Sequence, residues 1–227
     1  TAADAAAEPI VVAGSLRPPT DYSKVDLTAL DALPQEVRSR EVLYCAVLTD
    51  LVADRWCYRA AQAYGFEPGR PAPRRPQAVQ ADRGFVWDWV LRRLAAQGLL
   101  RDVDGETVEL SDAHWDDGVL DQTLADLPAS MTPMVELFRV AGEAYPAFLR
   151  GEVDGEDVLV SPTALPLWDR FFSNANINYG PVNRLVADYA RDRIPGEGLQ
   201  VLEVGGGFGS GCELTLPGLG ERLGHYA

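Results

Sequence analysis

The sequence of 227 residues lacks the features that mark several specialised classes of protein. It has no run of about 18 apolar residues, so it predicts no membrane-spanning helix. It does not open with a basic segment followed by an apolar one, so we expect no secretory leader. Basic charge is also scarce, because the formal net charge is −14, and an acidic chain repels phosphate backbones. We therefore expect neither a membrane nor nucleic acid as a partner.

Cysteine is rare, with three thiols at Cys45, Cys57 and Cys212. They form no CxxC pair and no cluster with histidine, so the spacing offers no structural zinc site and we assign no metal ligand, while a metal-assisted reaction stays open. Their odd number and loose spacing argue against a disulfide scaffold and favour a reducing, cytoplasmic location. The remaining composition, with 47% hydrophobic and 24% charged residues, is typical of a globular domain.

The two ends of the sequence lead us to expect a piece of a longer polypeptide. Residues 1–36 open with TAADAAAEPI and have the composition of a linker. Near the other end lies a glycine loop of the kind that normally opens a nucleotide-binding domain. We divide the rest into a helical, winged-helix-like lid region over residues 37–164 and the beginning of a cofactor-binding core over residues 165–227.

The lid region predicts helices and one hairpin. Helical spacing of apolar residues covers three segments, residues 35–64, 84–97 and 116–150. The runs LLRDV and TVEL flank Asp104 and Gly105, which is a strong hairpin signal. A helix followed by a hairpin is the outline of a winged helix. Because the candidate recognition helix carries only Arg92 and Arg93 on an acidic chain, we favour a dimer or lid module over DNA binding.

A proline-rich loop over residues 67–78 carries three arginines, Arg70, Arg74 and Arg75. Its prolines favour a solvated loop or hinge. Docking of an acidic carrier protein is the alternative that these positive charges leave open.

The second half of the sequence predicts helices and a buried strand. Residues 151–162 predict a turn with a strand or extended stretch. Apolar spacing predicts helices over residues 165–172 and 181–190, separated by the polar turn SNANINYGP. Residues 199–204, LQVLEV, are apolar without alternation, which predicts a strand buried on both faces of a parallel sheet. Residues 220–227 predict the end of one more helix.

The predicted strand runs directly into the glycines of VLEVGGGFGSG. Glycine adopts positive φ and lets a ligand approach the backbone without an intervening Cβ, and the helix expected next points free N–H groups at that ligand. A phosphate loop needs a Lys-Ser/Thr pair after its glycines, and none is present. A dinucleotide fold needs GxGxxG and an acid about 20 residues later, and that alternative stays open. Glu203, an acid inside an apolar strand, is costly unless it meets a donor.

The pattern apolar-apolar-acid-x-Gly-x-Gly-x-Gly in VLEVGGGFG resembles the first motif of class I S-adenosylmethionine (SAM) methyltransferases. More narrowly, LPLWDRFFSNANINYGPVNRLVADYA followed by VLEVGGGFGSGCE is similar to methyltransferase domains embedded in polyketide synthases, a resemblance that covers residues 85–227. It implies an α/β fold with a mostly helical N-terminal lid and a winged-helix-like hairpin. The start of a Rossmann-like methyltransferase sheet follows, incomplete in this chain.

The resemblance also implies site residues. In that family the glycine loop passes under the methionine and ribose parts of SAM. The residues that fall on this cofactor motif are Glu203, Gly205, Gly207 and Gly209. Tyr179 and Asn183 fall where a helix caps the amino-acid end of the cofactor, and the alternative is that they only cap and pack that helix.

No catalytic residue follows from the sequence. The family expects a second-strand acid, an adenine pocket and catalytic groups after the glycine loop, and we expect the chain to be inactive without them. His114 and His225 lack a partner acid at a recognisable spacing, so neither is assigned as a general base.

The favoured hypothesis is SAM-dependent methyl transfer to a small-molecule or carrier-bound acyl (polyketide) substrate, with carbon and oxygen acceptors both open. The expected partners are an acyl carrier protein or neighbouring synthase domains, and a homodimer stays open. One alternative is a non-catalytic pseudo-methyltransferase domain that docks neighbours in a megasynthase. Another is a free-standing dimeric O-methyltransferase. A winged-helix DNA regulator is disfavoured by the negative charge.

Overall fold

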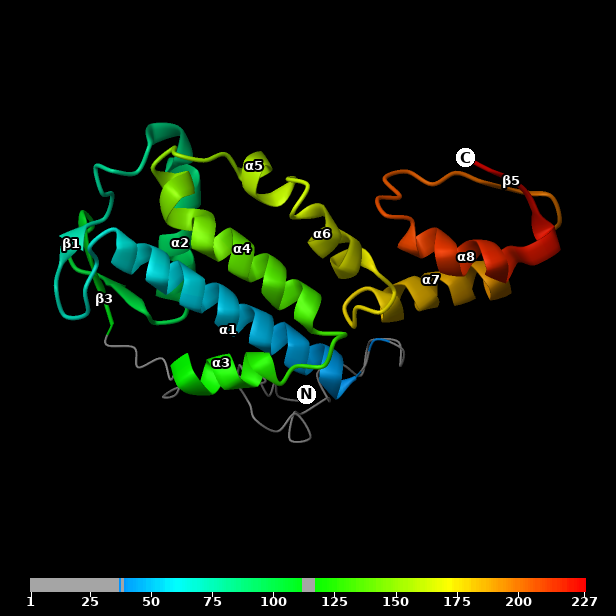
Figure 1. Cartoon of the computed structure of the whole chain (residues 1–227), viewed down its shortest axis with the longest axis horizontal. Coiled ribbons are helices and arrows are strands. Elements are labelled where there is room, and N and C mark those ends of the chain that lie inside the picture. The colour runs from blue at the N-terminus through cyan, green and yellow to red at the C-terminus, as the bar shows by residue number, and fades with distance from the viewer. Residues whose placement is uncertain (1–36, 38, 112–116) are drawn as a thin grey trace, which may run out of the picture. The chain divides into compact units, whose positions relative to one another are not determined.

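The computed structural model describes residues 37, 39–111 and 117–227, so the linker predicted over residues 1–36 lies outside the described residues. These residues form two compact units. Unit 1 is the described part of residues 47–126 and 135–164, and unit 2 is the remainder, chiefly residues 165–227. Figure 1 labels the helices α1 to α8 and the strands β1, β3 and β5. No helix among the described residues is long and apolar enough to cross a membrane.

The long helices of the first half lie where apolar spacing predicts them. They are α1 (Arg40–Ala63), α2 (Gly84–Ala96), α3 (Asp117–Ala125) and α4 (Thr132–Leu149), with the short η4 (Ala81–Arg83) ahead of α2. α1 ends just before Gly65, whose φ of 81° glycine adopts without strain. Figure 1 shows α1 and α4 side by side. Gly142 permits this approach, because a Cβ there would overlap the Trp56 ring.

The core of unit 1 gathers around Trp87 of α2, which is fully buried. Its ring centroid lies 5.1 Å from that of Tyr64 and 5.4 Å from that of Phe66. Its indole N–H donates to the Arg74 carbonyl at 2.8 Å, so the one polar group of this large buried ring is satisfied. Further members of the core are Cys57, Val90, Leu94, Val108, Leu110 and Leu149.

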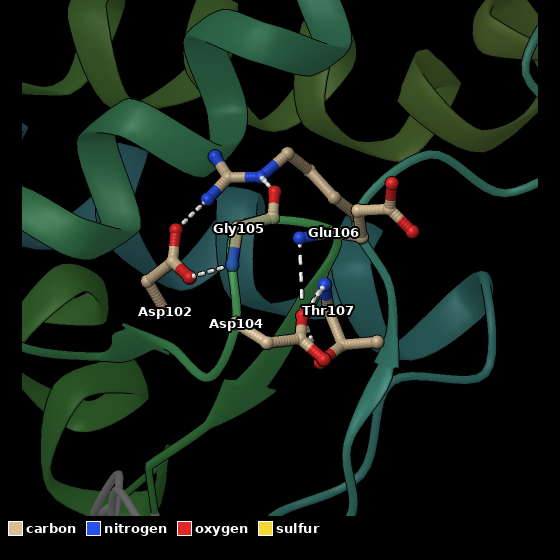
Figure 2. A network of polar contacts seen from close by, with 6 residues as sticks. Asp102, Asp104, Gly105, Glu106 and Thr107 are labelled. Atoms are coloured by element: carbon tan, nitrogen blue, oxygen red, sulfur yellow. Dashed lines mark hydrogen bonds and ion pairs between the residues drawn. The ribbon is translucent and has the colours of Figure 1, made fainter.

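The predicted hairpin is confirmed in unit 1. The strands are β1 (Ala72–Pro73), β2 (Leu100–Asp102) and β3 (Thr107–Leu110), and they form an antiparallel sheet in the order β1-β3-β2. At the turn, the Asp104 carboxylate accepts from the Thr107 hydroxyl at 2.8 Å and from the backbone N–H groups of Thr107 at 2.7 Å and Glu106 at 3.1 Å (Figure 2). These donors, the Thr107 hydroxyl foremost, hold the pKa of Asp104 below its ordinary value. A helix and a hairpin are therefore present, and their use as a winged-helix lid stays a prediction.

The arginines of the predicted proline-rich loop have acceptors within unit 1. Arg74 pairs with Asp102 at the base of the hairpin and donates to a carbonyl in its turn at 3.0 Å. Arg75 donates to a carbonyl of η4 at 3.1 Å. Arg70 pairs with Glu67 at 3.3 Å, and its side chain is 73% exposed. Arg74 therefore stabilises the hairpin, while Arg70 presents most of its side chain to solvent.

The prediction of an extended stretch over residues 151–162 is wrong, because α5 (Gly155–Leu159) lies there. Asp154 precedes the helix in an extended conformation, and Glu156 and Asp157 lie in its first turn. Acidic side chains stabilise the N-terminal end of a helix through its dipole. A short apolar run such as DVLV does not by itself distinguish a helix from a strand.

Unit 2 contains the predicted cofactor loop. Its elements are α6 (Leu165–Phe172), α7 (Gly180–Arg193), β4 (Leu199–Val201), α8 (Ser210–Leu219), η5 (Gly220–Arg222) and β5 (Leu223–Tyr226). The predicted helices α6 and α7 are confirmed. Pro181 lies in the first turn of α7, where the N–H that proline lacks has no intrahelical partner. α7 and α8 pack side by side (Figure 1).

Two predictions about the last residues are wrong. The strand predicted over residues 199–204 ends at Val201, and Leu202 and Val204 are 74% and 87% exposed instead of buried. Within the part of the chain that the structure describes, the sheet of unit 2 consists of β4 and β5, and Leu202 and Val204 follow β4 outside the sheet. Residues 220–227 form η5 and β5 instead of a helix end. β5 pairs in parallel with β4, a tertiary contact that no local pattern shows.

Candidate cofactor site

The predicted glycine loop joins a parallel strand to a helix. β4 leads into residues 205–209, α8 follows, and β5 returns parallel to β4. Gly205, Gly207 and Gly209 have φ angles of 75°, 56° and 80°, a left-handed conformation that favours glycine. No described heavy atom lies within 4 Å of the position that a Cβ would take at Gly205 or Gly209. The backbone of the loop is therefore open to a ligand at these two positions.

The loop is closed by its own hydrogen bonds before α8 begins. The N–H of Gly209 donates to the Gly206 carbonyl at 2.9 Å, and the Gly209 carbonyl accepts from the N–H of Glu213 at 3.1 Å. Gly209 is thus the N-cap of α8. The free N–H groups of the first turn of α8 directly follow the loop.

Glu203 lies next to the loop, and two neutral donors hold its carboxylate. The Cys212 thiol in α8 and the Tyr226 hydroxyl in β5 both donate to Glu203 Oε2, and Cys212 Sγ lies 2.6 Å from the Tyr226 oxygen. These bonds, that of Cys212 foremost, hold the pKa of Glu203 below its ordinary value. The bond to Glu203 raises the pKa of the Cys212 thiol, and the bonds to Cys212 and Glu203 raise the pKa of Tyr226. An acid in an apolar segment requires a hydrogen-bond donor, and Glu203 has two, the Cys212 thiol and the Tyr226 hydroxyl.

Asn183 lies in the first turns of α7, and its amide reaches the start of α8. Its N–H donates to Asn174 Oδ1 at 2.9 Å and to the Ser210 hydroxyl at 3.4 Å. Asn174 in turn donates to the Ser210 carbonyl at 2.6 Å and to the Glu213 carboxylate at 3.1 Å. The structure therefore brings Asn183 to the end of the glycine loop.

Tyr179 precedes α7, and its side chain makes no capping hydrogen bond. Its ring packs against Phe171 and Phe172, with centroid distances of 5.3 Å and 5.0 Å. Phe172 also stacks on Phe208 of the glycine loop, at 5.7 Å with 21° between the ring planes. Trp168 stacks on Phe172 at 5.5 Å. These five rings form an aromatic cluster that connects Tyr179 with the loop.

The structure thus brings all six residues of the predicted cofactor site into the neighbourhood of one loop, and cofactor contact stays a prediction for each. Sequence reasoning missed Asn174, Phe172, Phe208, Cys212 and Tyr226. Phe208 and Cys212 lie within VLEVGGGFGSGCE, so their position beside the motif could have drawn attention to them. Tyr226 had no such signal, because it reaches Glu203 only through the pairing of β5 with β4.

Of the two histidines, the structure describes His225. His225 lies exposed on β5 in register with Gln200, so its predicted place at the end of a helix is wrong. His114 lies outside the described residues. A search over the described residues finds no group of three or more His, Cys, Asp or Glu side chains that could hold a metal ion.

No family model matches the chain, and no curated protein gives a significant match. Solved structures do match. The crystal structure of the DszA carbon methyltransferase has a TM-score of 0.64 and 25% sequence identity, over 84% of this chain and 53% of that chain. The CurJ carbon methyltransferase has a TM-score of 0.63 and 18% identity, over 88% of this chain and 55% of that chain. The CMeT domain of the citrinin polyketide synthase has a TM-score of 0.61 and 18% identity, over 82% and 55%.

These structures confirm the predicted resemblance to methyltransferases and to a methyltransferase domain of a polyketide synthase. The chain spans about half the length of the solved structures that it matches. Methyl transfer is the activity that these structural neighbours have in common.

Proposed function

We propose that this chain takes part in SAM-dependent methyl transfer to a carbon atom, with the glycine loop of unit 2 as the cofactor site. The observation that carries the proposal is the open loop between β4 and α8, in which Gly205, Gly207 and Gly209 are left-handed beside the Glu203 carboxylate. The sequence left carbon and oxygen acceptors open. The 25% identity to a carbon methyltransferase favours carbon.

The residues at the loop fit SAM better than they fit a nucleotide phosphate. SAM carries positive charge on its sulfonium and on its ammonium group, and a carboxylate attracts both. A Cβ at Gly206 would lie 2.7 Å from Glu203 Cδ, so the carboxylate lies against the loop itself. The same negative charge would repel a phosphate, and the loop has no lysine to offset that repulsion. When bound, SAM supplies an electrophilic methyl group on its sulfur.

The other residues of the site would orient the cofactor and keep water out. Glu203 and the loop backbone would hold its amino-acid and ribose parts, and Asn183 offers an amide at the start of α8. Tyr179 and Phe208 supply apolar ring faces, and Phe208 is 45% exposed within the loop. Alignment of donor and acceptor and exclusion of water are the main contributions that a protein makes to such a transfer.

We propose a carrier-bound acyl chain as the methyl acceptor, and an acyl carrier protein or a neighbouring synthase domain as the partner. The similarity to the citrinin polyketide synthase CMeT domain supports this substrate class. Of the loop arginines, Arg70 is best placed to meet an acidic carrier, because its side chain is 73% exposed. Arg74 is less suitable, since it already pairs with Asp102.

Calorimetric titration of SAM into the longest natural polypeptide that contains residues 1–227 tests the proposed site. Gly205→Ala and Gly209→Ala should weaken SAM binding about tenfold or more. Each Cβ enters the open space at the loop, and the left-handed backbone costs about 1 kcal/mol for alanine. The matched control is Gly98→Ala after α2, where φ is 69° and the space beside the residue is equally open. It imposes the same backbone strain in unit 1 and should leave the SAM affinity unchanged.

The outcomes separate the alternatives. If the unsubstituted polypeptide binds no SAM, the proposed function is wrong. Binding of SAM without methyl transfer to a carrier-bound acyl chain would favour the non-catalytic pseudo-methyltransferase. Methylation of a free small molecule on oxygen would favour the free-standing O-methyltransferase.

A further inference from the structure

The side chain of Glu203 is contacted by groups from three different elements. On the loop, Gly206 approaches so closely that a Cβ would lie 2.8 Å from Glu203 Oε2, and at the start of α8 a Cβ on Gly211 would lie 3.8 Å from Oε1. The Cys212 thiol, one residue further along α8, donates to Oε2. The Tyr226 hydroxyl donates to the same oxygen from β5. A side chain held from loop, helix and strand has little freedom to rotate.

Backbone pairing fixes the position of Tyr226 relative to Glu203. Tyr226 is in register with Val201 of β4. Beyond the two strands, the N–H of Ala227 donates to the Val201 carbonyl at 3.0 Å, and the N–H of Glu203 donates to the Ala227 carbonyl at 2.9 Å. Because successive parallel hydrogen bonds set the register, the phenol reaches the carboxylate as a consequence of the β4–β5 pairing.

Both donors are neutral, and this has a chemical consequence. An arginine or lysine would hold a carboxylate equally well but would cancel its charge. A thiol and a phenol donate hydrogen bonds without cancelling the charge, and hydrogen bonds to the ionised form keep it ionised. The pKa of Glu203 is accordingly held below its ordinary value, first by Cys212 and then by Tyr226. Glu203 therefore presents an oriented and uncancelled negative charge at the loop.

We infer that Cys212 and Tyr226 are positioning residues for Glu203, which they orient and keep charged for a cationic ligand of the glycine loop. The inference rests on the proposed function, in which that ligand is SAM. It assigns neither residue a contact with the ligand. The titratable groups that face Glu203 are Cys212 from α8 and Tyr226 from β5.

The first experiment measures SAM affinity against pH in the same natural polypeptide, for the unsubstituted protein and for Cys212→Ala/Tyr226→Phe. Binding of a cation that requires ionised Glu203 is lost as the pH falls through the pKa of this carboxyl. Removing both donors raises that pKa, so the acid limb of the binding curve should move to higher pH. At neutral pH the affinity should fall about tenfold, as is usual when outer hydrogen-bond partners of a binding group are removed. The single variant Cys212→Ser keeps a hydrogen-bond donor at this position and should retain most of the SAM affinity of the unsubstituted protein.

A second measurement reports the geometry without SAM. Cys212 is half-buried, whereas Cys45 and Cys57 are buried, so iodoacetamide should react with Cys212 first in the folded protein. Because the bond to Glu203 is the main reason that the pKa of this thiol is raised, Glu203→Gln should accelerate its alkylation at pH 8. An unchanged rate would overturn the assigned contact. Circular dichroism checks that each variant is folded.

The results distinguish the two proposals. If the unsubstituted protein binds SAM but the acid limb does not move in the double variant, the positioning role is wrong while the proposed function stands. If the unsubstituted protein does not bind SAM, the proposed function and this inference both fail.

Discussion

The buried carboxyl of Asp54 in α1 should make the stability of unit 1 depend on pH. Asp54 is 3% exposed. Its Oδ1 lies 2.5 Å from Nε of Arg93 in an ion pair. Through Nη2, Arg93 donates to the carboxylate and the carbonyl of Asp50, both at 3.0 Å. Burial dominates over the attraction of Arg93 and raises the pKa of Asp54 from 3.8 to about 6. The folded protein therefore binds a proton at Asp54 more tightly than the unfolded chain does.

The sign and size of the effect follow from this difference. The contribution of Asp54 to the free energy of unfolding is largest at low pH, below about pH 4, where the carboxyl is protonated in both the folded and the unfolded protein. That contribution is lost as the pH rises to about 6. With about 1.36 kcal/mol for each pH unit between the two pKa values, the loss is about 3 kcal/mol.

The perturbation is Asp54→Asn, which keeps the size of the side chain and removes its titration. Urea unfolding, followed by tryptophan fluorescence from pH 4 to pH 8, gives the free energy of unfolding of both proteins. The value for the unsubstituted protein minus that for the variant should fall by about 2.4 kcal/mol between pH 4 and pH 7, because the unfolded carboxyl is already partly ionised at pH 4. Asp88→Asn, which removes an exposed carboxyl from α2, is the control for the loss of one negative charge. A difference for Asp54→Asn that is constant or rises with pH would refute the reasoning and show that the Arg93 ion pair outweighs burial.

Two further predictions concern packing and partner binding. Gly142→Ala should destabilise unit 1 by about 1–3 kcal/mol, because its Cβ would overlap the Trp56 ring. In the control Gly155→Ala the Cβ would lie 3.9 Å from Phe148, an ordinary contact, so equal melting temperatures for the two variants would contradict the packing argument. Arg70→Glu should weaken binding of an acyl carrier protein at low salt in a titration, with a smaller effect at high salt because exposed charges are screened. An affinity equal to that of the unsubstituted protein would argue against docking at this loop.

Local patterns predicted much of the fold. The apolar spacing of α1, α2 and α7 repeats with the period of a helix, so it identifies these elements whatever lies around them. The Asp104-Gly105 turn predicted the hairpin, because Gly105 adopts a φ of 88° and Asp104 accepts the hydrogen bonds of the turn residues. The glycine loop was predicted in the same way, because glycine is the residue that adopts a left-handed backbone without strain, and Gly205, Gly207 and Gly209 all do so.

The predictions that failed concern segments whose structure depends on weak local preferences or on contacts with residues far away in the sequence. α5 has only five residues, too few for the helical spacing of apolar residues to be recognised in the sequence, and the acidic residues of its first turn favour a helix. The burial expected of Leu202 and Val204 requires a longer strand with elements packed on both faces of its sheet, which no local pattern can report. The helix expected over residues 220–227 is replaced by β5, because a strand forms there through pairing with β4.

The sequence by itself determined the chemistry of the candidate site. The three left-handed glycines, the absence of a lysine after them and the acid at Glu203 are properties of one short segment, so they can be found without coordinates. Only the tertiary structure decided what holds Glu203. Cys212 is brought to it by the start of α8, and Tyr226 by the parallel pairing of β5. The physical reason is that strand register is a long-range property. It places a phenol 23 residues away against the carboxylate, and no pattern within either segment specifies that contact.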